Sequence, residues 1–270
     1  MRKMGDPSRL RGFAGFVEPQ LMDLVTEFVA SGNEQDCQEL KGFLKERLNK
    51  RKICAVDALP VLEKPNKNCL AEILFVIDQS GSMGGEETEK AVVANFNKVI
   101  AQQRAEEGDA VVSTVLFNTQ MVTMYESQPI AEVNELERRN YTPAGGTALL
   151  DAVGASIERI CKRQAALPDA ERPGTTIVVI ITDGEENSSR TYTQPIVKRM
   201  IQTLQEKHGW DFLYFGANVD HFAEAHNLGI DVEDSLSFDA CEEGINLCMA
   251  ECNHRVSYRR ARKRLTGRVE

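Results

Sequence analysis

The sequence predicts an α/β domain built on a doubly wound, mainly parallel sheet with one antiparallel edge strand. Two runs, ILFVI at 73–77 and IVVII at 177–181, are apolar at every residue. Such runs are typical of strands that are covered on both faces. Strand-like and helix-like segments alternate from residue 69 onward, which indicates parallel strands joined by helices. The short gap between the segments 110–117 and 121–125 predicts a hairpin at one edge of the sheet.

The separate elements follow from apolar periods of two residues in strands and 3.6 residues in helices. We expect strands at residues 70–77, 110–117, 121–125, 175–182, 211–215 and 235–238. We expect helices near residues 87–104, 148–164, 195–207, 220–227 and 241–262.

Three segments of the chain differ in pattern and charge. In residues 1–67, apolar side chains at helical spacing predict a helical hairpin at 17–48, followed by an extended connector at 49–67. Residues 68–254 form the α/β domain and contain 13 Lys or Arg against 30 Asp or Glu, a balance that repels nucleic acid and attracts cations. Residues 255–270 are basic, and we interpret them as the solvated end of the last helix.

Composition narrows the class of protein. The 270 residues are 42% hydrophobic and carry a net charge of −9, an ordinary mixture for a globular domain. The aliphatic runs are far shorter than the ~20 residues that cross a bilayer. The basic N-terminus lacks the apolar core of a signal peptide, so we expect a cytoplasmic protein with no membrane anchor.

The seven cysteines offer one alternative site. Their odd number favours reduced thiols. A zinc site could use Cys241, Cys248, Cys252 and His254, but the offsets of the three cysteines place them on one helical face, as expected of core residues. We therefore favour burial of these cysteines over metal binding.

Oxygen-bearing side chains follow both of the all-apolar strands. Asp78 ends the first strand and Asp183 follows the second, and the carboxyl ends of parallel strands share one edge of the sheet. If the chain stays extended, Ser80 and Ser82 point to the same side as Asp78. Thr147 follows a glycine pair in a third loop, from which its hydroxyl can reach the same crevice. Hard oxygen donors of this kind suit Mg²⁺, with Mn²⁺ and Ca²⁺ as alternatives.

Each of these residues also has a simpler interpretation when taken singly. Serines in such loops are commonly caps or turn residues. Thr147 is a candidate N-cap for the helix that follows it. Glu185 and Glu186, next to the Asp183-Gly184 turn, are typical of a solvated acidic corner. The metal interpretation depends on all three loops meeting at one edge.

Taken together, these motifs resemble those of the von Willebrand factor A domain. The matching features are D-x-S-x-S at 78–82, Thr147 after its glycine pair, and Asp183 in a TDG turn. The resemblance covers roughly residues 69–254. The stretch FLYFGANVDHFAEAHNLGI resembles the late strand–helix unit of stand-alone bacterial and phage members. The resemblance to the von Willebrand factor A domain implies a Rossmann-like fold. It also implies a metal-ion-dependent adhesion site made of Asp78, Ser80, Ser82, Thr147 and Asp183.

The resemblance also implies a function. In such a site the metal keeps a free coordination position, which an Asp or Glu of a partner protein fills. The expected partner is therefore a protein, with no nucleic acid or membrane involved.

Two other functions stay open at this point. One is a structural subunit of a bacterial or phage assembly, in which the metal only stabilises loops. The other is a Mg²⁺-dependent phosphotransfer enzyme, which we disfavour because Ser80 stands where a second carboxylate is wanted and no P-loop or G-x-S-x-G motif is present. We therefore expect no enzymatic activity.

Overall fold

The computed structural model describes residues 69–183, 185–217 and 221–267. The predicted helical hairpin at 17–48 and the connector at 49–67 lie outside the described residues. In the described part of the chain, no helix is long and apolar enough to cross a membrane.

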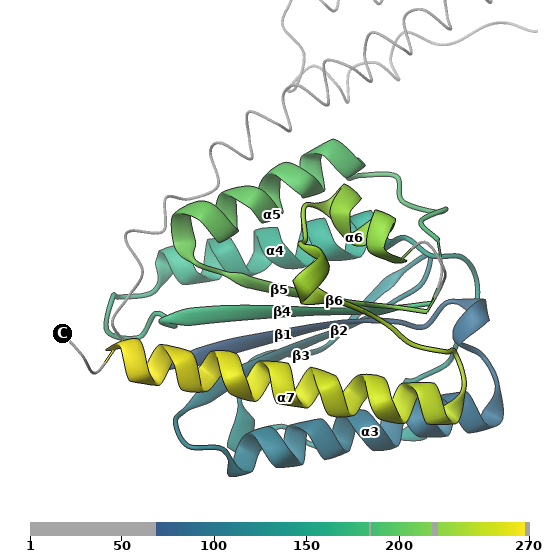
Figure 1. The fold of residues 1–270 in the computed structure, drawn as a ribbon, viewed down its shortest axis with the longest axis horizontal. Coiled ribbons are helices and arrows are strands. Elements are labelled where there is room, and N and C mark those ends of the chain that lie inside the picture. Colours follow the sequence, from purple (N-terminus) through teal and green to yellow (C-terminus); the bar gives the residue numbers. More distant parts are fainter. Residues whose placement is uncertain (1–68, 184, 218–220, 268–270) are drawn as a thin grey trace, which may run out of the picture. The chain divides into compact units, whose positions relative to one another are not determined.

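One mixed sheet forms the middle layer of the domain (Figure 1). Its strands are β1 (Ala71–Asp78), β2 (Ala110–Phe117), β3 (Met121–Pro129), β4 (Thr175–Thr182), β5 (Asp211–Gly216) and β6 (Ser235–Ser237). Their order across the sheet is β3-β2-β1-β4-β5-β6. Each neighbouring pair is parallel except β2 and β3, which are antiparallel. The predicted α/β class, with one antiparallel edge strand, is confirmed.

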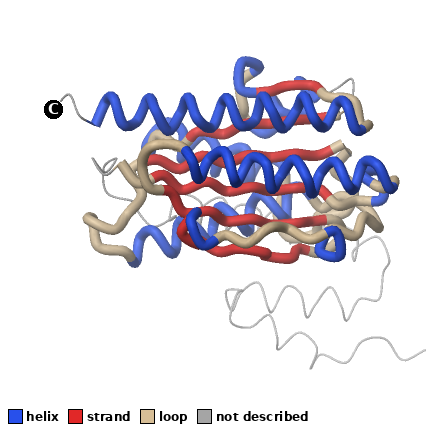
Figure 2. Tube along the Cα trace, turned by 90° about the horizontal axis from the view of Figure 1, so that it is seen from below, coloured by secondary structure: helices blue, strands red, loops and turns tan. Residues whose placement is uncertain are grey.

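Helices cover both faces of the sheet. They are α3 (Glu86–Ala105), α4 (Leu149–Ala166), α5 (Gln194–His208), α6 (His221–Leu228) and α7 (Glu242–Gly267). Helices α3 and α7 lie on one face, and α4, α5 and α6 lie on the other (Figures 1 and 2). Because both faces are covered, every residue of the central strands β1 and β4 is buried. The uninterrupted apolar runs at residues 73–77 and 177–181 are the consequence of this position.

The core beneath α3 and α7 is large and aromatic. Phe75 of β1 meets Phe96 of α3 edge to face, with ring centroids 5.5 Å apart. Cys248 and Cys252 of α7 are buried in the same cluster, as the helical offsets predict. The prediction is wrong for Cys241, which is exposed because the chain becomes helical only at Glu242. Burial raises the pKa of the Cys252 thiol to about 12, so this cysteine stays protonated at neutral pH. These two thiols therefore behave as small apolar core residues.

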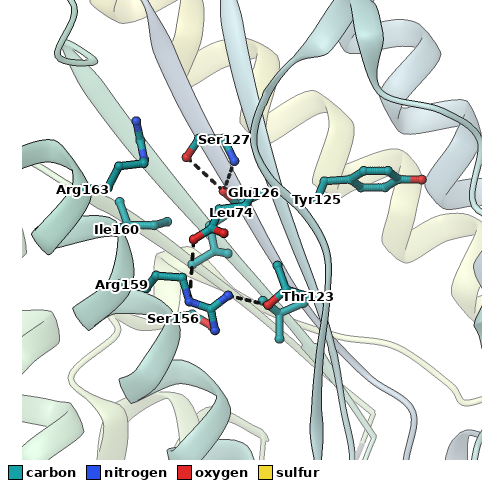
Figure 3. A pocket seen from close by; sticks show the side chains of 11 residues that line it. Leu74, Thr123, Tyr125, Glu126, Ser127, Ser156, Arg159, Ile160 and Arg163 are labelled. Atoms are coloured by element: carbon teal, nitrogen blue, oxygen red, sulfur yellow. Dashed lines mark hydrogen bonds and ion pairs between the residues drawn. The ribbon is translucent and has the colours of Figure 1, made fainter. Parts of the chain in front are cut away.

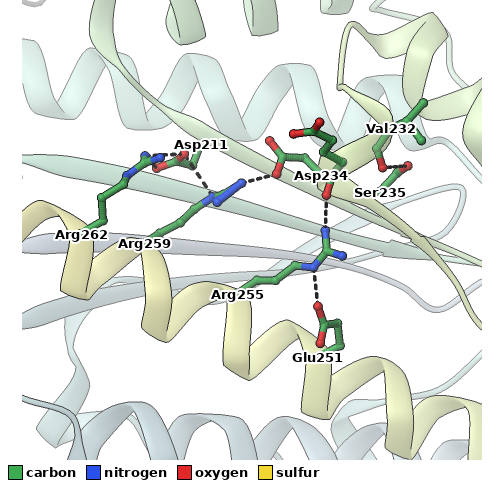
Figure 4. Close-up of polar contacts among 9 residues, drawn as sticks. Asp211, Val232, Asp234, Ser235, Glu251, Arg255, Arg259 and Arg262 are labelled. Carbon is green, nitrogen blue, oxygen red and sulfur yellow. Dashed lines mark hydrogen bonds and ion pairs between the residues drawn. The ribbon is translucent and has the colours of Figure 1, made fainter.

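The basic end of α7 differs from the sequence expectation. The helix continues beyond residue 254, and Arg259 and Arg260 are buried rather than solvated. Arg259 pairs with Asp211 and Asp234 (Figure 4). The guanidinium of Arg260 donates to the Gln103 carbonyl at 2.7 Å. The interpretation of this stretch as a solvated helix end is wrong at these two positions, because acceptors from distant parts of the chain pair with the guanidinium groups.

A buried carboxylate on β1 ties the antiparallel edge to α4. Glu72 is fully buried, pairs with Arg163, and accepts hydrogen bonds from Gln164 at 2.7 Å and from Ser127 at 2.8 Å. Ser127 lies where the register between β2 and β3 is irregular, and its φ of +46° is the one positive value among described non-glycine residues. This bulge turns the Ser127 hydroxyl toward Glu72. A small pocket lies beside it, lined from α4 by Arg159 and Arg163 (Figure 3).

We predict that Glu72→Ala destabilises the domain by about 2–4 kcal/mol, because it leaves Arg163 and Gln164 without their shared acceptor. The loss is smaller than for a fully buried pair since Arg163 reaches solvent. The measurement is urea unfolding. Glu126→Ala is the matched control: this carboxylate is exposed and lies 3.9 Å from the Arg159 Nε, so its loss changes stability by less than about 0.5 kcal/mol. Equal effects of the two variants would contradict this account.

Candidate metal centre

Neutral donors of the described residues hold Asp78 at the carboxyl end of β1. It is fully buried. Its Oδ1 accepts the Ser80 backbone N–H at 2.6 Å, and its Oδ2 accepts the Thr182 hydroxyl at 2.5 Å. The Tyr141 hydroxyl donates to the Asp78 carbonyl at 2.6 Å. The Thr182 contact follows from register, because Ile77 pairs with Ile181 and the next residues of both strands are therefore neighbours.

The serines reach the site by a different route from the one predicted. Ser80 is still extended, but residues Gly81–Met83 form a 3₁₀ turn, so strand alternation does not set the direction of Ser82. The turn nevertheless brings the Ser80 and Ser82 hydroxyl oxygens to 3.0 Å from each other. Ser82 then donates to Asp183 Oδ1 at 2.7 Å. Met83 points into the core and is fully buried, which anchors the turn.

Thr147 lies in a loop that is fixed through its backbone. Its N–H donates to Asn187 Oδ1 at 2.9 Å, and its carbonyl accepts the N–H groups of Asn187 and Ser188. These backbone contacts do not use the hydroxyl. Thr147 is not the N-cap of α4: Ala148 occupies that position, without a side-chain capping bond.

Glycines allow the first and second loops to touch. The Gly81 N–H donates to the Gly145 carbonyl at 3.0 Å, and the Ala144 N–H donates to the Gln79 carbonyl at 2.9 Å. Gly145 has a φ of +74°, a region that favours glycine. A Cβ on Gly146 would lie 2.4 Å from the Ser188 hydroxyl, so the third loop also packs tightly here.

Two carboxylates that sequence reasoning did not assign fix the third loop. Glu186 accepts the Leu150 N–H at the start of α4 at 2.9 Å, together with hydrogen bonds from Ser188 and Ser189. The sequence suggests a solvated acidic corner, which is wrong for Glu186. Asp151 of α4 accepts three N–H groups in return, from Arg190, Thr191 and Tyr192. The available signal was the pair of serines two and three residues after Glu186, the pattern of a side-chain-capped turn.

The charge of the site is not compensated by basic side chains in the described part of the chain. Burial raises the pKa of the Asp78 carboxyl to about 6, although the hydrogen bonds from Thr182 and Ser80 oppose the shift and Asp183 adds to it. Burial also raises the pKa of Asp183, against the hydrogen bond from Ser82. Within the described residues, no Lys or Arg forms an ion pair with either carboxylate. A bound cation would supply the missing charge, and the donors are the hard oxygens that divalent cations prefer.

Hydrogen bonds therefore connect four of the five predicted residues directly, and the fifth, Thr147, through its loop. Direct hydrogen bonds join Ser80 to Asp78 and Ser82, and Ser82 to Asp183. Thr147 belongs to the loop that contacts the first loop at Gly81 and the third at Asn187. The donor set fits a divalent cation, since it combines two carboxylates with three neutral hydroxyls.

Comparison with known proteins assigns the family. The model of the von Willebrand factor type A domain matches residues 72–243, and the chain belongs to this family. The inter-alpha-trypsin inhibitor heavy chain H3 of Mesocricetus auratus is 26% identical over 174 residues, which are 62% of this chain and 18% of that protein. Heavy chain H1 of the same species is 27% identical over 167 residues, 60% of this chain and 18% of that protein. The chain thus spans less than a fifth of the length of these relatives.

A solved structure agrees on the fold. Proximal thread matrix protein 1 from the mussel byssus superposes with a TM-score of 0.51 at 15% identity, covering 70% of this chain and 47% of that chain. At this identity the likeness concerns the fold alone.

We predict that Asp78→Asn makes the protein more stable when no metal is bound, because it removes a buried charge and keeps the shape of the side chain. The folded-state pKa is raised, so the cost of the charge is present above about pH 6 and lost at low pH. At pH 8 in EDTA the expected gain is about 1–3 kcal/mol in urea unfolding. The exposed Asp231→Asn serves as the control and should leave stability unchanged. A less stable Asp78→Asn protein would contradict the account.

Proposed function

We propose that the chain is a divalent-metal-dependent protein-binding module. In this proposal Asp78, Ser80, Ser82, Thr147 and Asp183 hold the cation, directly or through water, and Mg²⁺ is the cation in the cell. An Asp or Glu of a partner protein completes its coordination. The observation that carries the proposal is the meeting of three loops around two carboxylates that no basic side chain of the described residues neutralises.

The charged and the neutral residues of the proposed site have different roles. Asp78 and Asp183 supply negative charge, and the hydroxyls of Ser80, Ser82 and Thr147 supply neutral oxygens. A cation held by only two carboxylates keeps enough positive charge to attract a third from outside. Ser82 and Asp183 reach the surface, so a partner can approach from their side.

The loops are already fixed by contacts within the protein. This favours partner binding, and not stabilisation of the loops, as the role of the metal. Glu186 and Asp151 join the third loop to the start of α4 without any cation. A metal used only to hold the loops would therefore add little to what these bonds provide. A pre-formed site loses less conformational entropy when a partner binds.

The same arrangement gives no support to catalysis. Hydrolysis or phosphotransfer needs a group that moves protons near the metal. The four histidines lie outside the three loops, with His208 on α5, His221 and His226 on α6, and His254 on α7. The residue two positions after Asp78 is Ser80, which cannot act as a carboxylate acid or base.

We predict that partner binding needs both the metal and the two carboxylates. The chain, immobilised and incubated with native lysate, should retain a protein in Mg²⁺ that is absent in EDTA. Asp183→Ala should abolish retention, because the cation loses one of its two charged ligands. Gln120→Ala, an exposed change in the β2–β3 turn, is the matched control and should retain the protein. Retention that survives EDTA would contradict the proposal.

The structural alternative gives a different pattern in the same experiment. If the metal only stabilises loops, Mg²⁺ should raise the melting temperature of the wild type while leaving retention unchanged. The binding proposal expects both effects, and Asp183→Ala should lose both together.

A further inference from the structure

Helix α7 carries an apolar stripe on its outward face that no described element covers. Leu247, Tyr258 and Leu265 are 67%, 60% and 66% exposed, and they make up half of the large apolar side chains exposed in the described residues. Offsets of 11 and 7 residues place all three on one line along the helix. Isolated exposed apolar side chains are common, but an aligned set indicates a contact surface.

The opposite sides of α7 are engaged by other described elements, so the stripe is the face left for a partner. Toward α3, Asn246 bonds to Asn95 and Arg260 to Gln103. Toward β5 and the turn before β6, arginines of α7 pair with Asp211 and Asp234 (Figure 4). These contacts fix the rotation of the helix and hold the stripe outward.

With the polar residues Glu243 and His254 included, the stripe has seven positions that are spaced symmetrically along the helix. They are Glu243, Leu247, Ala250, His254, Tyr258, Ala261 and Leu265. The intervals between them are 4, 3, 4, 4, 3 and 4 residues, which read the same in both directions. His254 is the central residue. The stripe extends over about 33 Å at 1.5 Å per residue.

We propose that the chain forms a two-fold symmetric dimer in which the α7 helices of two copies pack antiparallel through this stripe, with His254 at the symmetry axis. In this register two of the three large apolar side chains meet an alanine, and the third, Leu265, meets Glu243 of the second copy. Leu247 faces Ala261 of the second copy, and Tyr258 faces Ala250. Large residues opposite small ones are the condition for close packing of two helices. An isologous pair of this kind closes on itself without forming fibres.

Charge selects the antiparallel orientation. The first turn of α7 carries Glu242 and Glu243, and its last turns carry Arg262, Lys263 and Arg264. An antiparallel pair places the acidic end of one helix beside the basic end of the other. A parallel pair would place like charges together and is disfavoured.

Formation of the dimer does not depend on the metal site, and each dimer contains two metal sites, one per chain. Helix α7 begins after β6, at the same edge of the sheet as Asp78, and runs toward the opposite edge. Antiparallel pairing therefore puts the two metal edges at opposite ends of the pair. A contact of one helix per copy is small beside the ~1,600 Å² of a standard interface, so the association is weak and concentration-dependent.

Sedimentation velocity over a range of protein concentrations tests the proposal. The wild type should shift from monomer to dimer as concentration rises, in Mg²⁺ and in EDTA alike. Leu247→Ser/Tyr258→Ser should stay monomeric, with an unchanged melting temperature because both side chains are exposed. Val232→Ser, another exposed apolar position, is the control and should dimerise as the wild type does.

A disulfide trap tests the register. In a Cys241→Ser background, His254→Cys places two thiols across the axis at a separation that a disulfide can bridge, and mild oxidation should yield a covalent dimer. Ala165→Cys, exposed on α4 at the other face of the sheet, should yield no more dimer than the background protein.

Three results would overturn the proposal. They are a wild type that is monomeric at every concentration, a double serine variant that still dimerises, and a double variant whose melting temperature falls with no change in mass. The last would mean that the stripe is covered within one chain. Because dimerisation should survive EDTA and Asp183→Ala, its failure is distinguishable from failure of the metal-dependent binding proposed above.

Discussion

The rest of the structure depends on a carboxylate buried at the end of a central strand. Asp78 has no exposure to solvent, and its side-chain contacts with the described residues are with the Ser80 N–H and the Thr182 hydroxyl. Neutral donors offset only part of the cost of burying a charge, so the pKa of Asp78 remains raised. A buried charge that is only partly compensated lowers the stability of the domain, so its presence calls for a functional reason. Its position makes physical sense if an external positive charge completes the site.

Burying this carboxylate requires the whole architecture around it. β1 lies in the middle of the sheet because its apolar run at residues 73–77 can be covered on both faces. β4 then lies beside it, which brings Thr182 to Asp78 and sets Asp183 at the same edge. The helices α3 and α7 cover one face of the sheet, and α4, α5 and α6 cover the other. The fold thus determines where the oxygens lie, and the loops determine how far each one reaches solvent.

The loops also explain why the site is suited to binding. Glu186 and Asp151 exchange hydrogen bonds between the third loop and α4, and glycines let the first two loops share backbone bonds. The site is therefore held in shape by the protein, and under the proposed function the open coordination position of a bound cation is left for a partner. The apolar face of α7 is a separate surface, because the helix is fixed to the domain through its other sides.

The sequence predicts well those features that depend on burial on both faces. Strands β1 and β4 fall within a residue of expectation, because a short uninterrupted apolar run between turn residues is typical of a strand covered by helices on both sides. Strand β3 is longer than predicted, since an edge strand with polar side chains up to Pro129 lacks the alternating signal.

Contacts between distant residues are what the sequence could not reveal. The burial of Arg259 and Arg260 depends on acceptors from other elements, and the role of Glu186 depends on the start of α4. The five proposed ligands could be found from type and spacing, yet the 3₁₀ turn that orients Ser82 could not.

The central claim is that a divalent cation binds between the carboxylates of Asp78 and Asp183. The most direct test is a crystal of the protein grown with Mn²⁺, measured at a wavelength where manganese scatters anomalously. The account predicts one strong anomalous peak per chain, within coordination distance of an oxygen of this site. A peak elsewhere on the domain, or none in crystals that contain Mn²⁺, would contradict it.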